Sequence, residues 1–229
     1  MAHSVKRHRA WVRVVVDVAM SVLFIVVMAT ALVQEVPHEY VGIALFIAVA
    51  VHIALNRRWF RALFRGRYNA VRMLQLVAVV GLLACMLGQV ISSLVLSKYA
   101  FGFLPSLPGA SWARRMHMLC SYWSFVFAFA HAGLQLKGFD RLVRPKGSES
   151  PSSLVWLGRI VVMMISCYGI YAIVQMRMGM YLLGLAQFAF VDFATPPVLT
   201  CMRYTAIAVL VTAAFHCLRR VIGTHGKRN

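Results

Sequence analysis

The chain has 229 residues, of which 61% are hydrophobic and only 13% are charged, and its mean hydropathy is +0.76. Soluble domains carry about 45–50% apolar and about 25% charged residues, so this composition argues against a soluble globular fold and indicates a lipid bilayer as the solvent. The formal charge of +18 sits in short basic clusters between long apolar runs, which argues against a nucleic-acid partner.

Six apolar runs are near the roughly 20 residues that a helix needs to cross a hydrocarbon core of about 30 Å. In chain order these predicted transmembrane helices are residues 14–33, 38–55, 73–95, 116–136, 154–174 and 198–218. The predicted fold class is therefore an all-α integral membrane helical bundle. It forms a single transmembrane domain over residues 1–229.

The basic residues predict the orientation of this bundle. With the N-terminus in the cytoplasm, 19 of the 24 Lys and Arg residues fall in inside segments. Cytoplasmic loops carry an excess of Lys and Arg, so we expect both the N- and the C-terminus in the cytoplasm. The spans at residues 38–55 and 116–136 then run in the same direction, from outside to inside.

Two predicted outside segments are longer than simple turns. Residues 97–115 contain Pro105, Pro108 and Gly109, which predict an ordered loop. If the chain is a redox subunit, this loop is a candidate docking surface. Residues 178–194 are apolar but interrupted by glycine and polar residues, which predicts an interfacial or re-entrant segment. A seventh span there would move the C-terminal arginine cluster to the outside.

Four of the eight histidines form a spacing pattern within the predicted spans. His38 and His52 are 14 residues apart, and so are His117 and His131. Fourteen residues are just under four helical turns, so the two histidines of each helix point the same way, about 21 Å apart along the axis. In the six-span arrangement His38 is level with His117, and His52 is level with His131.

Two facing imidazoles at one depth can take both axial positions of a haem iron, and two such tiers make a transmembrane electron relay. The pattern predicts an outer haem iron held by His38 and His117, and an inner one held by His52 and His131. The five cysteines form no C-x-x-C-H motif, so both haems would be non-covalent haem b.

Pairs of arginines flank the two tiers. Arg57 and Arg58 follow the inner histidine of one span, and Arg114 and Arg115 precede the outer histidine of the other. Guanidinium groups pair with carboxylates through two parallel hydrogen bonds. These four residues are therefore candidate partners of haem propionates, in addition to anchoring the helix ends.

Two further ionisable residues lie in the predicted spans. Asp17 comes one turn after Arg13, and an ion pair between them is the plain expectation. His216 lies three residues before Arg219, at a similar depth near the inner face. Together with the inner haem, Asp17 and His216 form a candidate quinone or proton site.

Two non-redox interpretations remain open. Histidines in membrane helices also serve as interhelical hydrogen-bonding residues, which would make the chain an anchor subunit. They could alternatively bind a metal ion for transport, although such sites need several converging ligands. Each tier offers only two histidines, and Glu39 beside His38 is the one intramembrane acid at a matching depth.

Short motifs in the first part of the chain resemble a known family. The series is H-E-x-x-G from His38, H-x-x-L-N-R-R-W from His52, S-K-x-x-F from Ser97 and H-x-G-L from His131. Over about the first 140 residues this order is similar to the flavinylation-associated cytochromes, which are small prokaryotic membrane proteins. Gln135 departs from the family's pattern, which often has a second histidine there followed by Trp.

The resemblance implies a di-haem b-type cytochrome that works beside extracytoplasmic proteins carrying covalently attached FMN. The presumed haem ligands match His38, His52, His117 and His131. We place the haem-binding core in residues 14–136 and the C-terminal helices in residues 154–218.

These observations together predict transmembrane electron transfer in the cytoplasmic (inner) membrane of a prokaryote. Electrons would pass from the quinol pool or an inner donor to an extracytoplasmic flavoprotein or reductase. The chain lacks an NAD(P)H-binding fold, so we expect an electron-transfer subunit of a membrane oxidoreductase rather than a self-contained enzyme. The expected cofactors are two haem b and a quinone, and membrane lipid is the expected environment.

Overall fold

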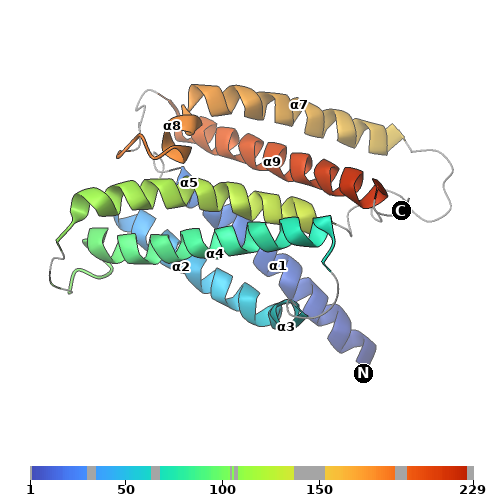
Figure 1. Cartoon of the computed structure of the whole chain (residues 1–229), viewed down its shortest axis with the longest axis horizontal. Coiled ribbons are helices and arrows are strands. Elements are labelled where there is room, and N and C mark those ends of the chain that lie inside the picture. Colours follow the sequence, from blue (N-terminus) through green and yellow to red (C-terminus); the bar gives the residue numbers. More distant parts are fainter. Residues whose placement is uncertain are drawn as a thin grey trace. The chain divides into compact units, whose positions relative to one another are not determined.

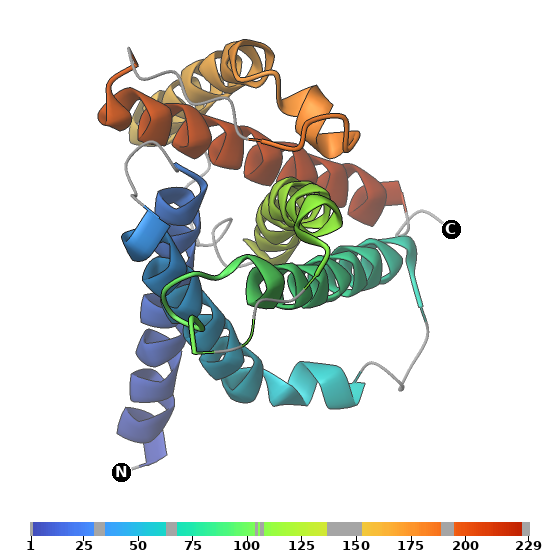
Figure 2. The ribbon, with the colours of Figure 1, turned by 90° about the vertical axis from the view of Figure 1, so that its left-hand side faces the viewer.

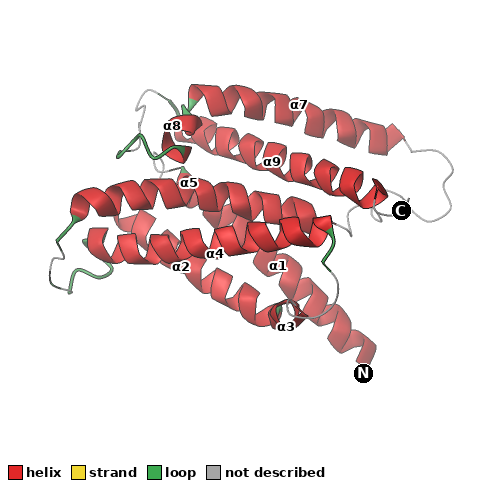
Figure 3. Cartoon of the chain, viewed as in Figure 1, coloured by secondary structure: helices red, strands yellow, loops and turns green. Residues whose placement is uncertain are grey.

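The computed structural model of the chain describes residues 2–29, 35–62, 68–103, 105, 108–136, 153–188 and 195–225. Within these ranges every regular element is a helix (Figure 3). The chain forms two compact units. The first comprises Met1–Arg67, Ser97–Phe103 and Val191–Cys201, and the second comprises Tyr68–Leu96, Leu104–Phe190 and Met202–Asn229.

Figure 1 labels the helices in chain order. They are α1 (Ala2–Met28), α2 (Glu35–Leu55), α3 (Arg57–Ala62), α4 (Ala70–Leu96), α5 (Ala110–Gln135), α7 (Ser153–Gln175), α8 (Met178–Leu182) and α9 (Pro197–His225). Five of them, α1, α2, α4, α7 and α9, are long and apolar enough to cross a membrane. The chain therefore has the character of a multi-pass membrane protein.

The remaining predicted span, the fourth in chain order at residues 116–136, falls on α5. This helix has 26 residues, but its Ser, Tyr, Trp and His residues lower its hydropathy, and it is not among the five apolar helices. Six spans with both termini inside thus stay a prediction. Part of the first predicted span, residues 30–33, lies outside the described residues.

The predicted loop over residues 97–115 is shorter than the sequence pattern indicated. α5 begins at Ala110, directly after Gly109, whose φ of 106° is a left-handed conformation that glycine adopts without strain. Arg114 and Arg115 therefore lie within the first two turns of a helix rather than in a loop. The prediction was wrong here because Ser111, Arg114 and Arg115 interrupt the first turns of the helix, and a continuous apolar run marks only the lipid-facing part of a helix.

The predicted interfacial segment, residues 178–194, is described up to residue 188. It contains α8, which at five residues is too short to cross a membrane. Met178 and Tyr181 of α8 are buried. The Trp123 indole N–H of α5 donates to the Leu182 carbonyl at 2.9 Å, so α8 is fastened against α5.

In the first unit, α1 packs along α2 (Figure 2). Met28, Ala29 and Leu45 are buried in this unit. α2 ends at a turn at Asn56, whose backbone N–H donates to the His52 carbonyl at 3.0 Å. α3 then begins at Arg57, so the chain changes direction directly after the predicted end of the second span.

In the second unit, α4 and α5 pack closely and run antiparallel. Gly81 and Gly88 are seven residues apart on α4, and they face Phe127 and Cys120, which are seven apart on α5 in the reverse order. A Cβ added at Gly88 would lie 2.5 Å from the Cys120 Sγ. Small residues of this kind let membrane helices approach one another closely.

α9 contacts both α5 and α7 within the second unit. A Cβ at Gly133 of α5 would collide with the Thr212 backbone carbonyl, and one at Gly169 of α7 would lie 2.6 Å from the Ala206 carbonyl. The hydroxyls of Tyr122 and Tyr204, both buried, are 3.0 Å apart. These contacts hold α5, which carries two of the candidate histidines, against α9.

Candidate functional site

The two histidine pairs lie on two unbroken helices that belong to different units. α2 carries His38 and His52 in the first unit, and α5 carries His117 and His131 in the second. All four side chains are half-buried. Each predicted tier takes one histidine from each unit, so the pairing of His38 with His117 and of His52 with His131 stays a prediction.

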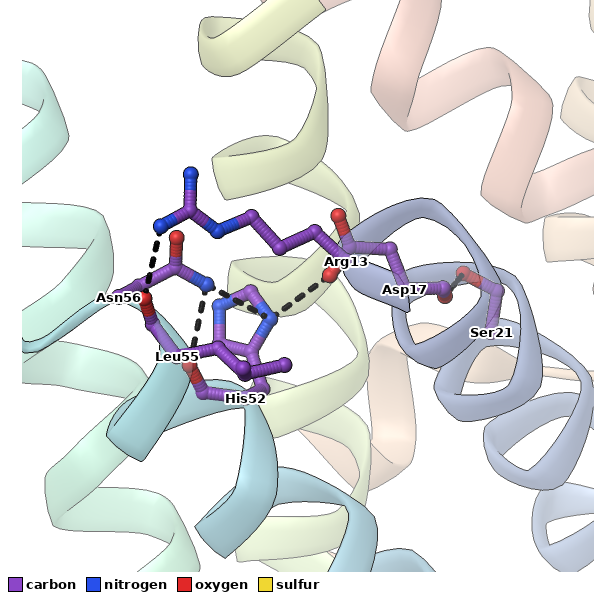
Figure 4. Close-up of polar contacts among 6 residues, drawn as sticks. All are labelled: Arg13, Asp17, Ser21, His52, Leu55 and Asn56. Carbon is purple, nitrogen blue, oxygen red and sulfur yellow. Dashed lines mark hydrogen bonds and ion pairs between the residues drawn. The ribbon is translucent and has the colours of Figure 1, made fainter. Parts of the chain in front are cut away.

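His52 has a close carboxylate partner on α1 (Figure 4). Its Nδ1 lies 2.7 Å from the Asp17 Oδ1. Asn56 is one turn further along, and its side-chain N–H donates to the His52 carbonyl at 3.0 Å. The sequence patterns did not reveal this contact, because Asp17 and His52 are 35 residues apart and meet only through the packing of α1 on α2.

The prediction of an ion pair between Asp17 and Arg13 was wrong. Within the described residues the Arg13 guanidinium instead donates to the Leu55 carbonyl at 3.0 Å (Figure 4). Leu55 is the last residue of α2, where the backbone carbonyls lack partners within the helix and attract cations. Arg13 thus caps α2, and Asp17 turns to the histidine.

The Asp17 contact determines the proton position on the neutral His52 ring. An ionised carboxylate only accepts hydrogen bonds, so Nδ1 carries the proton and Nε2 presents its lone pair. Histidines that ligate metals commonly donate their other ring N–H to a carboxylate in this way. The geometry at His52 therefore fits an axial ligand.

His38 lies at the opposite end of α2, beside a carboxylate that binds a loop. The Glu39 side chain accepts hydrogen bonds from the Ser97 hydroxyl at 2.7 Å and from three backbone N–H groups, those of Lys98 at 2.9 Å, Tyr99 at 3.2 Å and Ala100 at 2.7 Å. The motifs from His38 and from Ser97 thus meet in the first unit. Because these four donors occupy Glu39, its carboxylate is committed to the loop.

The surroundings of His38 also leave space on α2. Gly42, one turn after His38, has open space around it, and an added Cβ would meet nothing within 4 Å. The helix face that carries His38 is therefore open at this glycine, as a flat macrocycle beside it would require.

His117 on α5 is surrounded by polar side chains of the second unit. The Ser92 hydroxyl lies 3.3 Å from its Nδ1. Its backbone carbonyl accepts from the Ser121 hydroxyl at 2.7 Å and from the Gln89 amide of α4 at 3.3 Å. Gln89 also hydrogen-bonds the Ser121 hydroxyl, so α4 and α5 are joined at the level of His117.

A second glutamine joins α4 and α5 near His131. The buried Gln75 side chain donates to the Leu134 carbonyl at 3.3 Å. Gln75 and Gln89 are 14 residues apart, the same interval as the two histidines of α5. This repeated interval on adjacent apolar segments was the sequence signal that could have identified them.

The four candidate propionate partners have different environments. Arg114 lies over the Phe188 ring, 5.3 Å from its centroid, and Arg115 donates to the Gln187 side-chain oxygen in the amide orientation that satisfies both groups. Arg57 and Arg58 are exposed at the start of α3. Their pairing with propionates stays a prediction.

The structure does not bring the candidate quinone residues together within one unit. Asp17 lies in the first unit and His216 lies in the second, half-buried on α9. Across the described part of the chain, no group of three or more His, Cys, Asp or Glu residues converges as a metal-ion site. The metal-transport alternative needs such a group.

No protein-family model, curated protein or solved structure matches the chain. The similarity to the flavinylation-associated cytochromes rests on the motif series alone.

Proposed function

We propose that this chain is a di-haem b-type cytochrome that transfers electrons across the cytoplasmic membrane of a prokaryote. The observation that carries the proposal is the equal 14-residue spacing of two histidine pairs on two unbroken helices, α2 and α5. His38 and His117 would ligate the outer haem, and His52 and His131 the inner haem. When bound, each haem supplies a one-electron carrier with two axial imidazoles.

Two features of the first unit support this assignment. Asp17 leaves the Nε2 lone pair of neutral His52 to face a ligand, and Gly42 leaves room on the His38 face of α2. A third feature weighs against the metal-transport alternative, since Glu39 already accepts four hydrogen bonds from residues 97–100. The donor set suits a flat bis-histidine cofactor better than a converging ion site.

The proposed partners rest on the resemblance to the flavinylation-associated cytochromes and on the predicted six-span orientation. The quinol pool or an inner donor would supply electrons at the His52 side, and an FMN-carrying extracytoplasmic protein would receive them at the His38 side. The loop that Glu39 organises, residues 97–103, belongs to the same unit and end of α2 as His38. We infer that the chain is an electron-transfer subunit that hands electrons to this partner.

The haem content of the purified full-length protein tests the proposal. We expect a b-type reduced-minus-oxidised spectrum and two haems per chain by the pyridine haemochrome method. His38→Ala and His52→Ala should each lose one haem. His216→Ala, a histidine outside the spacing pattern, is the matched control and should retain both.

Other results would contradict the proposal at defined points. Colourless protein after expression with ample haem would reject the cytochrome and favour the anchor or transporter. One haem per chain would retain a cytochrome but reject the two tiers.

The candidate quinone site has its own test. If His216→Ala or Asp17→Asn slowed reduction by a quinol at unchanged haem content, the candidate quinone site would be supported.

A further inference from the structure

The contact between Asp17 and His52 differs from an ordinary helix-to-helix hydrogen bond. A carboxylate within a predicted membrane span is costly, and such residues commonly have a functional role. Asp17 does not pair with Arg13, the basic residue one turn before it on α1, which instead caps α2 at Leu55. Instead its Oδ1 lies 2.7 Å from the Nδ1 of a candidate iron ligand.

The geometry of this contact is set within the first unit. α1 packs along α2, and Arg13 and Asp17 reach α2 one turn apart, at Leu55 and His52 respectively. Asn56, one turn after His52, donates to the His52 carbonyl, and its amide lies 3.4 Å from the same ring nitrogen, Nδ1. The His52 ring is therefore oriented by α1 and by its own helix before any cofactor binds.

A hydrogen bond from Nδ1–H to a carboxylate has two consequences for a ligating imidazole. It fixes the tautomer and the ring orientation, and it makes Nε2 a more basic donor. A more basic ligand stabilises ferric over ferrous iron because ferric iron carries the greater positive charge. The reduction potential of the ligated haem then falls.

We propose that Asp17 is a positioning residue for the inner haem. It holds the proton of His52 on Nδ1, directs Nε2 to the iron and lowers the reduction potential of that haem relative to a variant without the carboxylate. This inference rests on the proposed function.

Two variants separate the charge of Asp17 from its role as an acceptor. Asp17→Asn keeps an oxygen acceptor but removes the negative charge, whereas Asp17→Leu removes both. Glu35→Gln is the control, because Glu35 is a carboxylate of the same unit whose side chain, in the described part of the chain, pairs with Lys98 at 3.1 Å and not with a histidine. The measurements are redox titration of both haems in the full-length holoprotein, and ¹⁵N NMR of histidine-labelled, haem-free full-length protein.

The redox titration should show one shifted haem. In Asp17→Asn we expect the ratio of ferric to ferrous affinity to fall about tenfold at one haem, which raises its midpoint potential by about 59 mV. The shifted haem should be the one that His52→Ala lacks. Asp17→Leu should also bind that haem about tenfold more weakly, and Glu35→Gln should change neither potential.

The NMR measurement reads the tautomer independently of haem. His52 should carry its proton on Nδ1 in the wild-type chain and in Asp17→Asn, and should lose this preference in Asp17→Leu. Unchanged potentials in both Asp17 variants would overturn the inference, as would an equal shift of both haems or a shift in Glu35→Gln. If the wild-type chain binds no haem, both the proposed function and the role of Asp17 in directing Nε2 to the iron are rejected. The NMR result still decides whether Asp17 holds the His52 proton on Nδ1.

Discussion

The carboxylate of Glu39 accepts the backbone N–H of Ala100 at 2.7 Å, across 61 positions of the sequence. The same side chain accepts from Ser97, Lys98 and Tyr99, so one carboxylate organises a whole turn of the loop after α4. Successive N–H groups that converge on one anion form a concave binding site for it. Glu39 therefore connects the start of α2 with a segment that the sequence places far away.

Replacement of Glu39 should loosen this loop without unfolding α2. Hydrogen bonds to a charged acceptor contribute about 1.5–3 kcal/mol each, so in Glu39→Ala the amides of residues 98–100 should exchange with solvent at least tenfold faster. Glu39→Gln keeps one acceptor oxygen and should fall between the wild type and Glu39→Ala. Hydrogen exchange with mass spectrometry measures this, and Asp17→Asn serves as the control, because Asp17 is a carboxylate of the same unit that contacts His52 rather than the loop. Equal protection of the loop in Glu39→Ala would show that Glu39 does not organise it.

Two glycines of α7 should respond oppositely to a methyl group. Gly169 faces the Ala206 backbone, which cannot rotate away, whereas Gly158 has nothing within 4 Å of an added Cβ. Gly169→Ala should lower the free energy of unfolding by about 1–3 kcal/mol through overpacking. Gly158→Ala should leave it unchanged or raise it by up to about 1 kcal/mol through helix propensity. Denaturant unfolding in detergent compares them, and equal effects would contradict the contact between α7 and α9.

The buried Tyr122 and Tyr204 hydroxyls should behave as a coupled pair. Either single change to Phe leaves the other hydroxyl buried without this partner, at a cost of about 1–3 kcal/mol. The double variant removes both hydroxyls and should cost little more than one single change. A double-mutant cycle measures the coupling, which we expect to be about 1 kcal/mol. Additive costs would show that the two hydroxyls act independently.

The side of the membrane on which each terminus lies reports whether α5 crosses the membrane. Six spans place both termini on the same side, and the basic residues place them inside. We therefore expect a green fluorescent protein fusion at either terminus to fluoresce and an alkaline phosphatase fusion at the C-terminus to be inactive. If α5 does not cross, the five apolar helices place the termini on opposite sides, and the C-terminal phosphatase fusion becomes active.

The long apolar helices could be predicted from the sequence because lipid imposes a length and a composition on every crossing segment. The polar ends of helices carry no such requirement. The start of α5 at Ala110 was therefore missed, although Gly109 marks it. α5 itself was predicted as a span from the apolar run at residues 116–136. Because its hydropathy is lower than that of the five apolar helices, the topology experiment is needed to test whether it crosses the membrane.

In the candidate site too, features within one helix could be predicted from the sequence, whereas contacts between helices could not. The spacing of His38 and His52 is a property of one helix, so the sequence predicts that both lie on the same face of α2. The Asp17 contact depends on how α1 is rotated against α2, and the spacing rules within one helix pointed to Arg13 instead. Contacts between helices depend on rotation and register, which a hydropathy pattern does not encode.

The paired glutamines of α4 bear on how α5 can move. Gln75 and Gln89 hold α5 at Leu134 and at His117, near its two ends, and Gly81 and Gly88 fit Phe127 and Cys120 between them. A slide of one helix past the other by a single turn, about 5.4 Å, would break both amide contacts and drive the glycines out of register at the same time. We therefore expect any displacement of α5 along its axis to move α4 with it, so that the two helices shift as one rigid body.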